Sequence, residues 1–258
     1  MSSNIPLSTL FPDSPVIMAY DHYNERPVAL KIRDDFMCQL PAFYDVILEE
    51  ASKWQALNHS NIVKIYEESS LGGIYYLAME YLNGSSLRDH ILKQGPLGIH
   101  ETMRILLPAL NAAHFLHRRG VQHRRILAKN IFLTTEGRVV LLDFGISHAF
   151  DNYCEVHAEK LWVRHWADAL PLNDIMGFGV IMIQCLTGLK SLNTERHIYP
   201  GQPIDMLVNY EECYNNFLKQ FNSPQWLSKV LYKAIFQQEN SRYENIGDMI
   251  HDLEQVMN

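Results

Sequence analysis

The stretch from His117 to Ser147 constrains the fold most strongly, because it predicts a β-hairpin at a fixed place in the chain. It contains two short apolar segments, Ile131–Leu133 and Val139–Leu142, which have the composition of strands. The five residues between them include Gly137, which can take the positive φ that a tight hairpin turn needs. The residues before the first strand are typical of a helix end followed by a loop.

Two polar side chains flank this hairpin, Asn130 just before it and Asp143 just after it. Because a hairpin brings its two ends together, the amide oxygen of Asn130 and the carboxylate of Asp143 are expected to lie side by side. Hard oxygen ligands suit Mg²⁺, which binds few protein groups and takes the rest of its shell from water and phosphate. The sequence therefore predicts a Mg²⁺ site with Asn130 and Asp143 as its protein ligands.

The residues around the hairpin resemble the catalytic loop and the metal-binding motif of protein kinases. His123–Arg125 is followed five positions later by Asn130, and Asp143–Gly145 reads Asp-Phe-Gly. The resemblance implies an α+β, bilobal, kinase-like fold. It assigns residues 1–82 to a small β-rich N-lobe and residues 83–258 to a larger helical C-lobe of the same domain. The amino-acid sequences of several segments are most similar to those of bacterial serine/threonine kinases.

One position departs from the family pattern, which is His-Arg-Asp. The family's Asp accepts the proton of the substrate hydroxyl, and here that position is Arg125. A guanidinium group has no acceptor atom and cannot be deprotonated in a protein. The resemblance gives catalytic-loop roles to His123, Arg125 and Asn130, with Arg125 as an inactivating replacement, and the family's Lys in this loop is Leu127.

A lysine on an apolar strand is the next feature that the resemblance explains. Residues 27–32 form an apolar segment that contains Lys31, and an unpaired buried ammonium group is costly. The segment resembles the kinase strand whose lysine holds the α- and β-phosphates of ATP. Its carboxylate partner is expected on a helix over residues 42–57, where the family's Glu falls on Glu50, or on Glu49 if the register is shifted by one.

The same resemblance predicts which residues bind the nucleotide. Residues 79–82 resemble the hinge that binds adenine through its backbone. The residues expected to bind ATP are Lys31, Glu50, Ala29, Val16, Met79, Glu80, Leu82, Phe132 and Asp143.

The glycine-rich loop that covers the phosphates in kinases is missing. The chain has no glycine before Gly72, and Phe11–Pro15 stands where the loop belongs. Its two prolines remove backbone donors, and Asp13 would face phosphate with like charge. This segment is poorly suited to holding a triphosphate.

Further elements are expected along the rest of the chain. They are strands at 62–66 and 74–80 with a turn at 72–73, helices at 85–94 and 101–117, a buried helix beginning near Asp174, and C-terminal helices within 234–253. Pro108 predicts a kink in the second of these helices. The resemblance implies that the Asp174 carboxylate holds the backbone of the His123–Arg124 loop by hydrogen bonds.

The activation segment is short. His157–Glu159 is the nearest counterpart of the family's Ala-Pro-Glu, and the resemblance pairs its Glu159 with Arg242. Between Asp143 and Glu159 the hydroxyl side chains are those of Ser147 and Tyr153. Neither resembles the usual phosphothreonine switch.

Composition excludes several classes of function. With 258 residues, 47% of them hydrophobic and 20% charged, the chain can form one large or two-lobed soluble domain with a core. The net charge of −7 argues against binding to nucleic acid or anionic membranes. No apolar run approaches about 18 residues, so no membrane span is expected, and no export signal is visible. The expected localisation is cytoplasmic, or delivery by a secretion system without a recognisable signal. The four cysteines have no CxxC spacing, so free thiols are expected.

Three functions remain open at this point. The first is a pseudokinase, a regulatory or scaffolding module that binds a protein partner and for which ATP and Mg²⁺ are possible ligands. The second is an active atypical kinase or nucleotidyl transferase that uses Lys31, Glu50, Asn130 and Asp143. The third is a protein-interaction domain that binds no nucleotide.

Overall fold

The structure is a computed structural model that describes residues 16–33, 53–71, 74–124, 126–143, 174–188, 210–236 and 242–257. The chain divides into two compact units. The N-terminal unit comprises Met1–Asn83, Gly145–Leu170 and His197–Gln202, and the C-terminal unit comprises Gly84–Phe144, Pro171–Arg196 and Pro203–Asn258.

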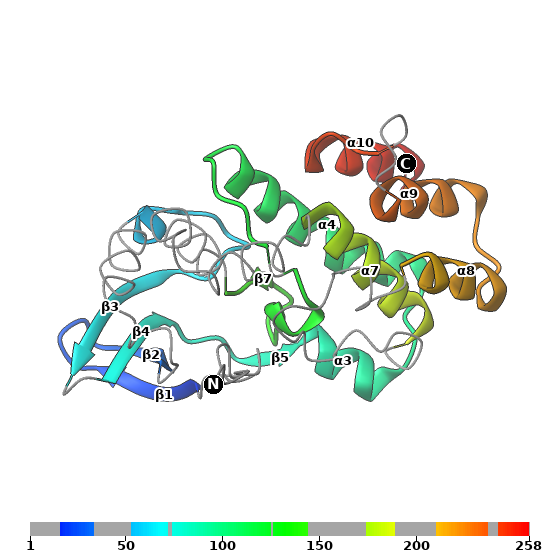
Figure 1. The fold of residues 1–258 in the computed structure, drawn as a ribbon. Helices are drawn as coiled ribbons and strands as arrows, with labels where there is room; N and C mark the ends of the chain where they lie inside the picture. Colours follow the sequence, from blue (N-terminus) through cyan, green and yellow to red (C-terminus); the bar gives the residue numbers. More distant parts are fainter. Residues whose placement is uncertain are drawn as a thin grey trace, which may run out of the picture. The chain divides into compact units, whose positions relative to one another are not determined.

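The described part of the N-terminal unit is dominated by an antiparallel sheet (Figure 1). Its strands are β1 (Val16–Asp21), β2 (Arg26–Arg33), β3 (Ile65–Leu71) and β4 (Ile74–Glu80), in the order β1-β2-β4-β3. The strands are rich in Val, Ile, Leu and Tyr, which suit a pleated and partly buried surface. The β1–β2 turn is closed by Asp21, whose carboxylate accepts the backbone N–H of Asn24 at 3.0 Å and the Arg26 Nε–H at 3.2 Å.

Strand register sorts the side chains of this sheet onto two faces. Ala29 pairs with Met18 on one side and with Met79 on the other, so these three residues share a face. Lys31 lies two residues along β2 and therefore projects from the same face.

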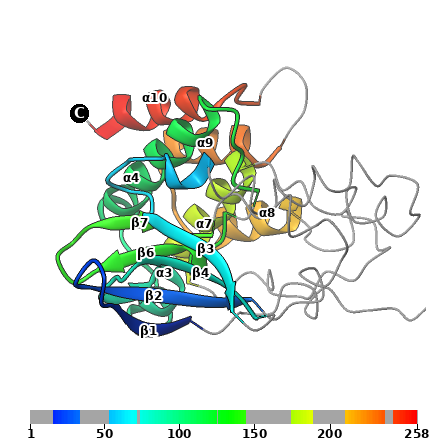
Figure 2. The same ribbon diagram turned by 90° about the vertical axis from the view of Figure 1, so that its left-hand side faces the viewer.

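The C-terminal unit is mainly helical, with one small sheet. Its helices are α3 (Leu87–Gln94), α4 (Ile99–His117), α7 (Asp174–Thr187), α8 (Tyr210–Gln220), α9 (Gln225–Ile235) and α10 (Ile246–Met257). The sheet contains β5 (Gly84–Ser86), β6 (Ile131–Thr134) and β7 (Val139–Leu141), and the 3₁₀ turn η2 (Ala128–Asn130) precedes β6. The green strands β6 and β7 can be followed in Figure 2.

Helix α7 is the centre of this unit. Eleven of its fourteen residues are buried, and it packs against both α4 and α9. Gly179 allows the close contact with α9, because a Cβ there would lie 3.0 Å from the Cβ of Ala234. A helix that is apolar on all sides belongs in the core of its unit, and α7 therefore gives its first residue, Asp174, a buried position.

Polar side chains join α9 to α10 through hydrogen bonds to Asp252. One oxygen of Asp252, Oδ2, accepts hydrogen bonds from Lys233 Nζ at 2.7 Å and from the Tyr243 hydroxyl at 2.9 Å. Burial, with the Asp252 carboxylate as acceptor, raises the pKa of Tyr243. The hydroxyl thus remains a proton donor at neutral pH.

Among the predicted elements that differ from the structure at their boundaries, three differ for a local reason. The strand expected at 62–66 begins only at Ile65, because Ile62 follows a turn in which its N–H donates to the His59 carbonyl. The helix expected at 85–94 begins at Leu87, since Ser86 caps it by accepting the Asp89 N–H.

The third difference lies within 234–253. Helix α9 ends at Ile235, where Phe236 turns to extended backbone, and α10 begins only at Ile246. The start of α10 is marked by Asn245, whose side-chain oxygen accepts the Asp248 N–H at 3.1 Å. Helix α4, in contrast, continues through Pro108 to His117. The helix expected at 42–57 lies outside the described residues except for its last turn.

Candidate functional site

The two ends of the β6–β7 hairpin meet at Asn130, as the sequence predicts. The Leu142 N–H donates to the Asn130 carbonyl at 2.8 Å, next to the paired residues Ile131 and Leu141. Gly137 has a φ of 86°, which is the conformation that the turn requires. This pairing brings Asn130, which is 3% exposed, beside the residue that precedes Asp143.

His123 fixes the backbone at the same place. Its ring is fully buried, and its Nε2 lies 2.7 Å from the Leu142 carbonyl oxygen. A carbonyl only accepts, so Nε2 carries the proton in this hydrogen bond. Burial lowers the pKa of His123 below its usual value. The ring is therefore neutral at neutral pH and supports the chain just before Asp143.

Asp174 holds the loop that contains His123. Its carboxylate accepts the backbone N–H of His123 at 2.8 Å and that of Arg124 at 2.6 Å. These are the two hydrogen bonds that the sequence resemblance implies, and this prediction is confirmed. Asp174 is 3% exposed, so the negative charge depends on these donors.

A third donor to Asp174 was missed by the sequence interpretation. His117, at the end of α4, lies with its Nε2 2.7 Å from Asp174 Oδ2. An ionised carboxylate is an acceptor only, so Nε2–H is the donor. The two residues are 57 positions apart, and no local pattern relates them.

Two residues of this site adopt a backbone conformation that is rare outside glycine. Arg124 has a φ of 60° and Asp143 a φ of 59°. Such conformations cost on the order of 1–3 kcal/mol each and persist where the surroundings impose them. At Arg124 the hydrogen bond to Asp174 does so. These two positions lie just before η2 and just after β7, on either side of the hairpin.

In the N-terminal unit, four of the predicted nucleotide-binding residues share one face of the sheet. Val16 on β1 pairs with Lys31 on β2, and Ala29 pairs with Met79 on β4. Glu80 ends β4, and its N–H donates to the Lys64 carbonyl at 2.8 Å. Leu82 follows without regular structure. Register alone thus gathers an apolar surface around one lysine.

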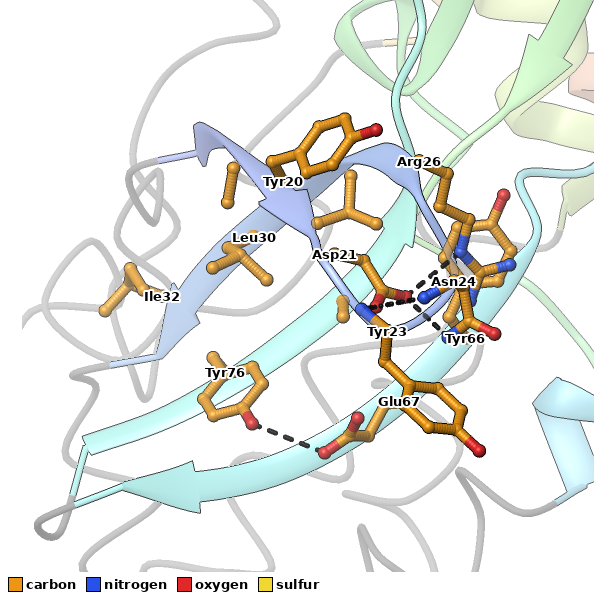
Figure 3. Close-up of a pocket in the computed structure, with 13 residues that line it drawn as sticks. Tyr20, Asp21, Tyr23, Asn24, Arg26, Leu30, Ile32, Tyr66, Glu67 and Tyr76 are labelled. Atoms are coloured by element: carbon orange, nitrogen blue, oxygen red, sulfur yellow. Dashed lines mark hydrogen bonds and ion pairs between the residues drawn. The ribbon is translucent and has the colours of Figure 1, made fainter.

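The opposite face of this sheet carries a hollow of about 730 Å³. Figure 3 shows Leu30 and Ile32 along it and, at its polar end, Asp21 held by Asn24 and Arg26. The guanidinium of Arg26 also lies 3.5 Å from the centroid of the Tyr66 ring. Because Lys31 and Ala29 project from the other face, this hollow is not the predicted nucleotide site.

Several predicted site residues lie outside the described part of the chain. These are Glu50 and its fallback Glu49, Arg125, and the segments 11–15 and 144–173. Phe132 lies on β6 and is half-buried. Among the four cysteines, Cys185 is a free and buried thiol, as expected, and burial raises its pKa to about 12.

A family model described as the protein kinase domain matches residues 13–242. The chain belongs to the protein kinase family. Serine/threonine-protein kinase PrkC of Bacillus subtilis is 27% identical over 249 residues, which cover 92% of this chain and 38% of PrkC. Serine/threonine-protein kinase PknB of Mycobacterium leprae is 27% identical over 261 aligned residues, covering 94% of this chain and 41% of PknB. This kinase-family chain thus spans about two-fifths of the length of these relatives.

Solved kinase structures show the same fold. The kinase domain of Mycobacterium tuberculosis PknI matches with a TM-score of 0.70 at 17% identity, over 99% of both chains. Rad53 residues 1–466 in complex with AMP-PNP match with a TM-score of 0.67 at 19% identity, over 94% of this chain and 62% of that one. The predicted bacterial, α+β, kinase-like fold is confirmed.

The sequence predicts no membrane-spanning segment. Among the helices that the structure describes, none has an apolar stretch long enough to cross a bilayer.

Proposed function

We propose that this kinase-family protein is a pseudokinase, which binds ATP and acts on a protein partner without transferring phosphate. The observation that carries the proposal is Arg125 in place of the family's catalytic Asp. Phosphoryl transfer relies on positioning and electrostatic stabilisation. In this chain the loop lacks the catalytic base, and Leu127 replaces the phosphate-contacting lysine. We therefore expect the loop to contribute little to positioning or to electrostatic stabilisation.

The framework around this loop supports binding. Asp174 and His123 hold its backbone by hydrogen bonds. A protein that had lost every use for the loop would have no need of two strained residues beside it, Arg124 and Asp143.

ATP and Mg²⁺ are the proposed ligands. Lys31, expected to pair with Glu50, would hold the α- and β-phosphates, and Ala29 and Met79 would contact adenine from the same face of the sheet. Asn130 and Asp143, brought together by the hairpin, would provide the protein oxygens for Mg²⁺. When bound, Mg²⁺ neutralises phosphate charge.

The test of nucleotide binding is a thermal shift measurement with ATP, with and without Mg²⁺. We expect ATP to raise the melting temperature and Mg²⁺ to increase the shift, because a ligand that binds only the folded state stabilises it. Asp143→Asn should remove the dependence on Mg²⁺ while leaving a shift by ATP alone. An equal Mg²⁺ effect in that variant would contradict the proposed metal site. No shift with any nucleotide would favour a protein-interaction domain instead.

An active transferase of unusual design is the second candidate, and it is supported by the presence of Asn130 and Asp143 and by the hydrogen bond from the Leu142 N–H to the Asn130 carbonyl, which brings their backbones near each other. Incubation with ATP labelled at the γ- or the α-phosphate separates the possibilities. Label from the γ position on a protein would indicate a kinase, and label from the α position a nucleotidyl transferase. We expect neither.

We also propose a lobe boundary after residue 82, a regulatory protein partner, and action in the cytoplasm or after delivery by a secretion system. None of them affects the nucleotide test.

A further inference from the structure

The hollow on the sheet face opposite Lys31 has an apolar floor (Figure 3). Strand β2 contributes Val28, Leu30 and Ile32, which alternate along the strand and therefore project from one face. Ala78 on β4 pairs with Leu30 and extends the floor. Val28 and Ile32 are four residues apart, so the floor is about 13 Å long. The volume of about 730 Å³ lies in the range of small-molecule sites in proteins.

The charges that line this hollow do not balance. Asp21 accepts hydrogen bonds from the β1–β2 turn and from Arg26 Nε, at 2.8–3.2 Å, and these donors compensate its charge. Glu67 is exposed, and its hydrogen-bond partner among the described residues is a neutral group, the Tyr76 hydroxyl at 3.3 Å. With two carboxylates and one guanidinium, the lining carries a net charge of −1. The excess negative charge belongs to Glu67.

Four tyrosines border the hollow, namely Tyr20, Tyr23, Tyr66 and Tyr76. The face of an aromatic ring attracts a cation. One of these rings already binds one, because the Arg26 guanidinium lies 3.5 Å from the centroid of Tyr66. Tyr20 is 52% exposed and Tyr23 is 94% exposed, so a ligand can reach both side chains. Aromatic rings beside a carboxylate suit the binding of an ammonium group.

A ligand of this hollow has to match both the apolar floor and the negative end. A peptide backbone on the floor would leave its N–H and C=O groups against aliphatic side chains, and unsatisfied polar groups are costly. An anionic group would meet Glu67 with like charge. We propose that the hollow binds a small amphipathic cation, with a hydrocarbon body along the floor and an ammonium group beside Glu67 and Tyr76. This inference goes beyond the proposed function, because the site lies on the face opposite Lys31.

Calorimetric titration of the full chain with octyltrimethylammonium tests the proposal. The comparison compounds are 1-octanol, which has the same alkyl chain without a charge, and octanoate, which carries the opposite charge. We expect octyltrimethylammonium to bind most tightly and octanoate least tightly. Shortening the alkyl chain from octyl to butyl should weaken binding by roughly two- to fourfold per methylene group, because less apolar surface is buried. No binding, equal affinity for octanoate, or no effect of chain length would overturn the proposal.

A single substitution tests the role of Glu67. Glu67→Gln keeps the shape of the side chain and removes its charge. We expect it to weaken octyltrimethylammonium binding roughly tenfold, as the loss of one ion pair near the surface allows, and to leave the affinity for 1-octanol unchanged. A purely structural role of Glu67 would weaken both. Glu136→Gln, which changes an exposed glutamate of the β6–β7 turn, is the matched control and should bind like the wild type. Unchanged binding by Glu67→Gln would overturn the assignment of the charge.

Two further measurements identify the site and the kind of ligand. Saturating ATP with Mg²⁺ should leave octyltrimethylammonium binding unchanged, because Lys31 projects from the other face. Competition between the two would place the probe in the nucleotide site and overturn the inference. A blocked peptide of alternating lysine and alanine carries the same charge on a protein chain. If this peptide binds more tightly than octyltrimethylammonium, the assignment to a small molecule is wrong.

Discussion

At the scale of single residues, Asp174 is the group on which the catalytic-loop framework depends. Its buried carboxylate accepts three hydrogen bonds, from His117 and from the backbone of His123 and Arg124. Hydrogen bonds to a charged group contribute more than neutral ones, and donors left unsatisfied in a buried place cost the full desolvation penalty. The strained φ of Arg124 is maintained by the same carboxylate.

We expect Asp174→Asn to lower the free energy of unfolding by about 2–4 kcal/mol, because an amide cannot accept all three hydrogen bonds. Chemical denaturation measures this loss. Asp248→Asn is the matched control, since Asp248 is exposed and its change should be nearly neutral. Equal stability of the two variants would show that the three hydrogen bonds contribute little.

We expect His123 to make the stability of the protein depend on pH. Its pKa in the folded protein is lowered by burial from the ordinary value of 6.5, so the unfolded chain binds a proton more readily than the folded one. The contribution of the neutral ring is fully present above about pH 6.5 and is lost as the pH falls toward the folded-state pKa. We expect the melting temperature to fall between about pH 7.5 and pH 5.5, and to fall less in His123→Gln. His100→Gln, which changes an exposed histidine, should keep the wild-type profile.

At the scale of elements, Gly84 sets the close pairing of β5 with β6. Gly84 has a φ of 154° and pairs with Thr134, and a Cβ added there would lie 2.0 Å from the Leu133 carbonyl oxygen. This neighbour is backbone in the middle of a strand, so it cannot move aside without breaking the pairing. Gly98, the N-cap of α4, has no atom within 4 Å of such a Cβ.

We therefore expect Gly84→Ala to destabilise the protein by about 2–4 kcal/mol, through strain and lost strand pairing. Gly98→Ala should cost less, about 0.5–1 kcal/mol, because Ala is a poorer N-cap than Gly but its Cβ meets no neighbouring atom. Thermal melting of both variants checks this expectation. A Gly84→Ala protein that melts like the wild type would mean that β5 does not need its close approach to β6.

The elements also show how far the sequence could be interpreted. Local patterns were sufficient for the β6–β7 hairpin, where Gly137 and the apolar segments act over a few residues. The family resemblance was sufficient for Asp174. The helix boundaries predicted from the sequence were wrong where a side chain caps the backbone, as those of Ser86 and Asn245 do. A capping side chain competes with regular structure at a single residue, which a pattern over many residues does not detect. The sequence interpretation did not include the His117–Asp174 hydrogen bond, since it depends on a contact between segments 57 residues apart.

At the scale of the whole molecule, two groups of predicted site residues belong to different units of the chain. The sheet of the N-terminal unit gathers Val16, Ala29, Lys31 and Met79 on one face by register. The C-terminal unit provides Asn130 and Asp143 through a hairpin whose ends are tied together. Each of these two groups of residues lies within one unit, so neither group needs residue 125 for its arrangement. Position 125 is where transfer chemistry is expected to be lost.

The last prediction concerns Arg125 and decides between a pseudokinase and an active enzyme. In the family, a substrate hydroxyl and the γ-phosphate meet at this position, and a guanidinium there offers fixed donors and a permanent positive charge. It should therefore hold a terminal phosphate rather than activate a nucleophile. We expect ATP to bind more tightly than ADP, with no measurable transfer of phosphate to protein substrates.

Three variants test this role by nucleotide titration and by transfer of labelled phosphate. Arg125→Ala should abolish the preference for ATP over ADP, because the donor to the terminal phosphate is removed. Arg118→Ala, which removes an exposed arginine of the same unit, should keep the preference. Arg125→Asp restores an acceptor but not the missing glycine-rich loop, so at most weak transfer is expected from it. A preference that survives Arg125→Ala would contradict the phosphate-binding role, and substrate phosphorylation by the wild-type protein would contradict the pseudokinase itself.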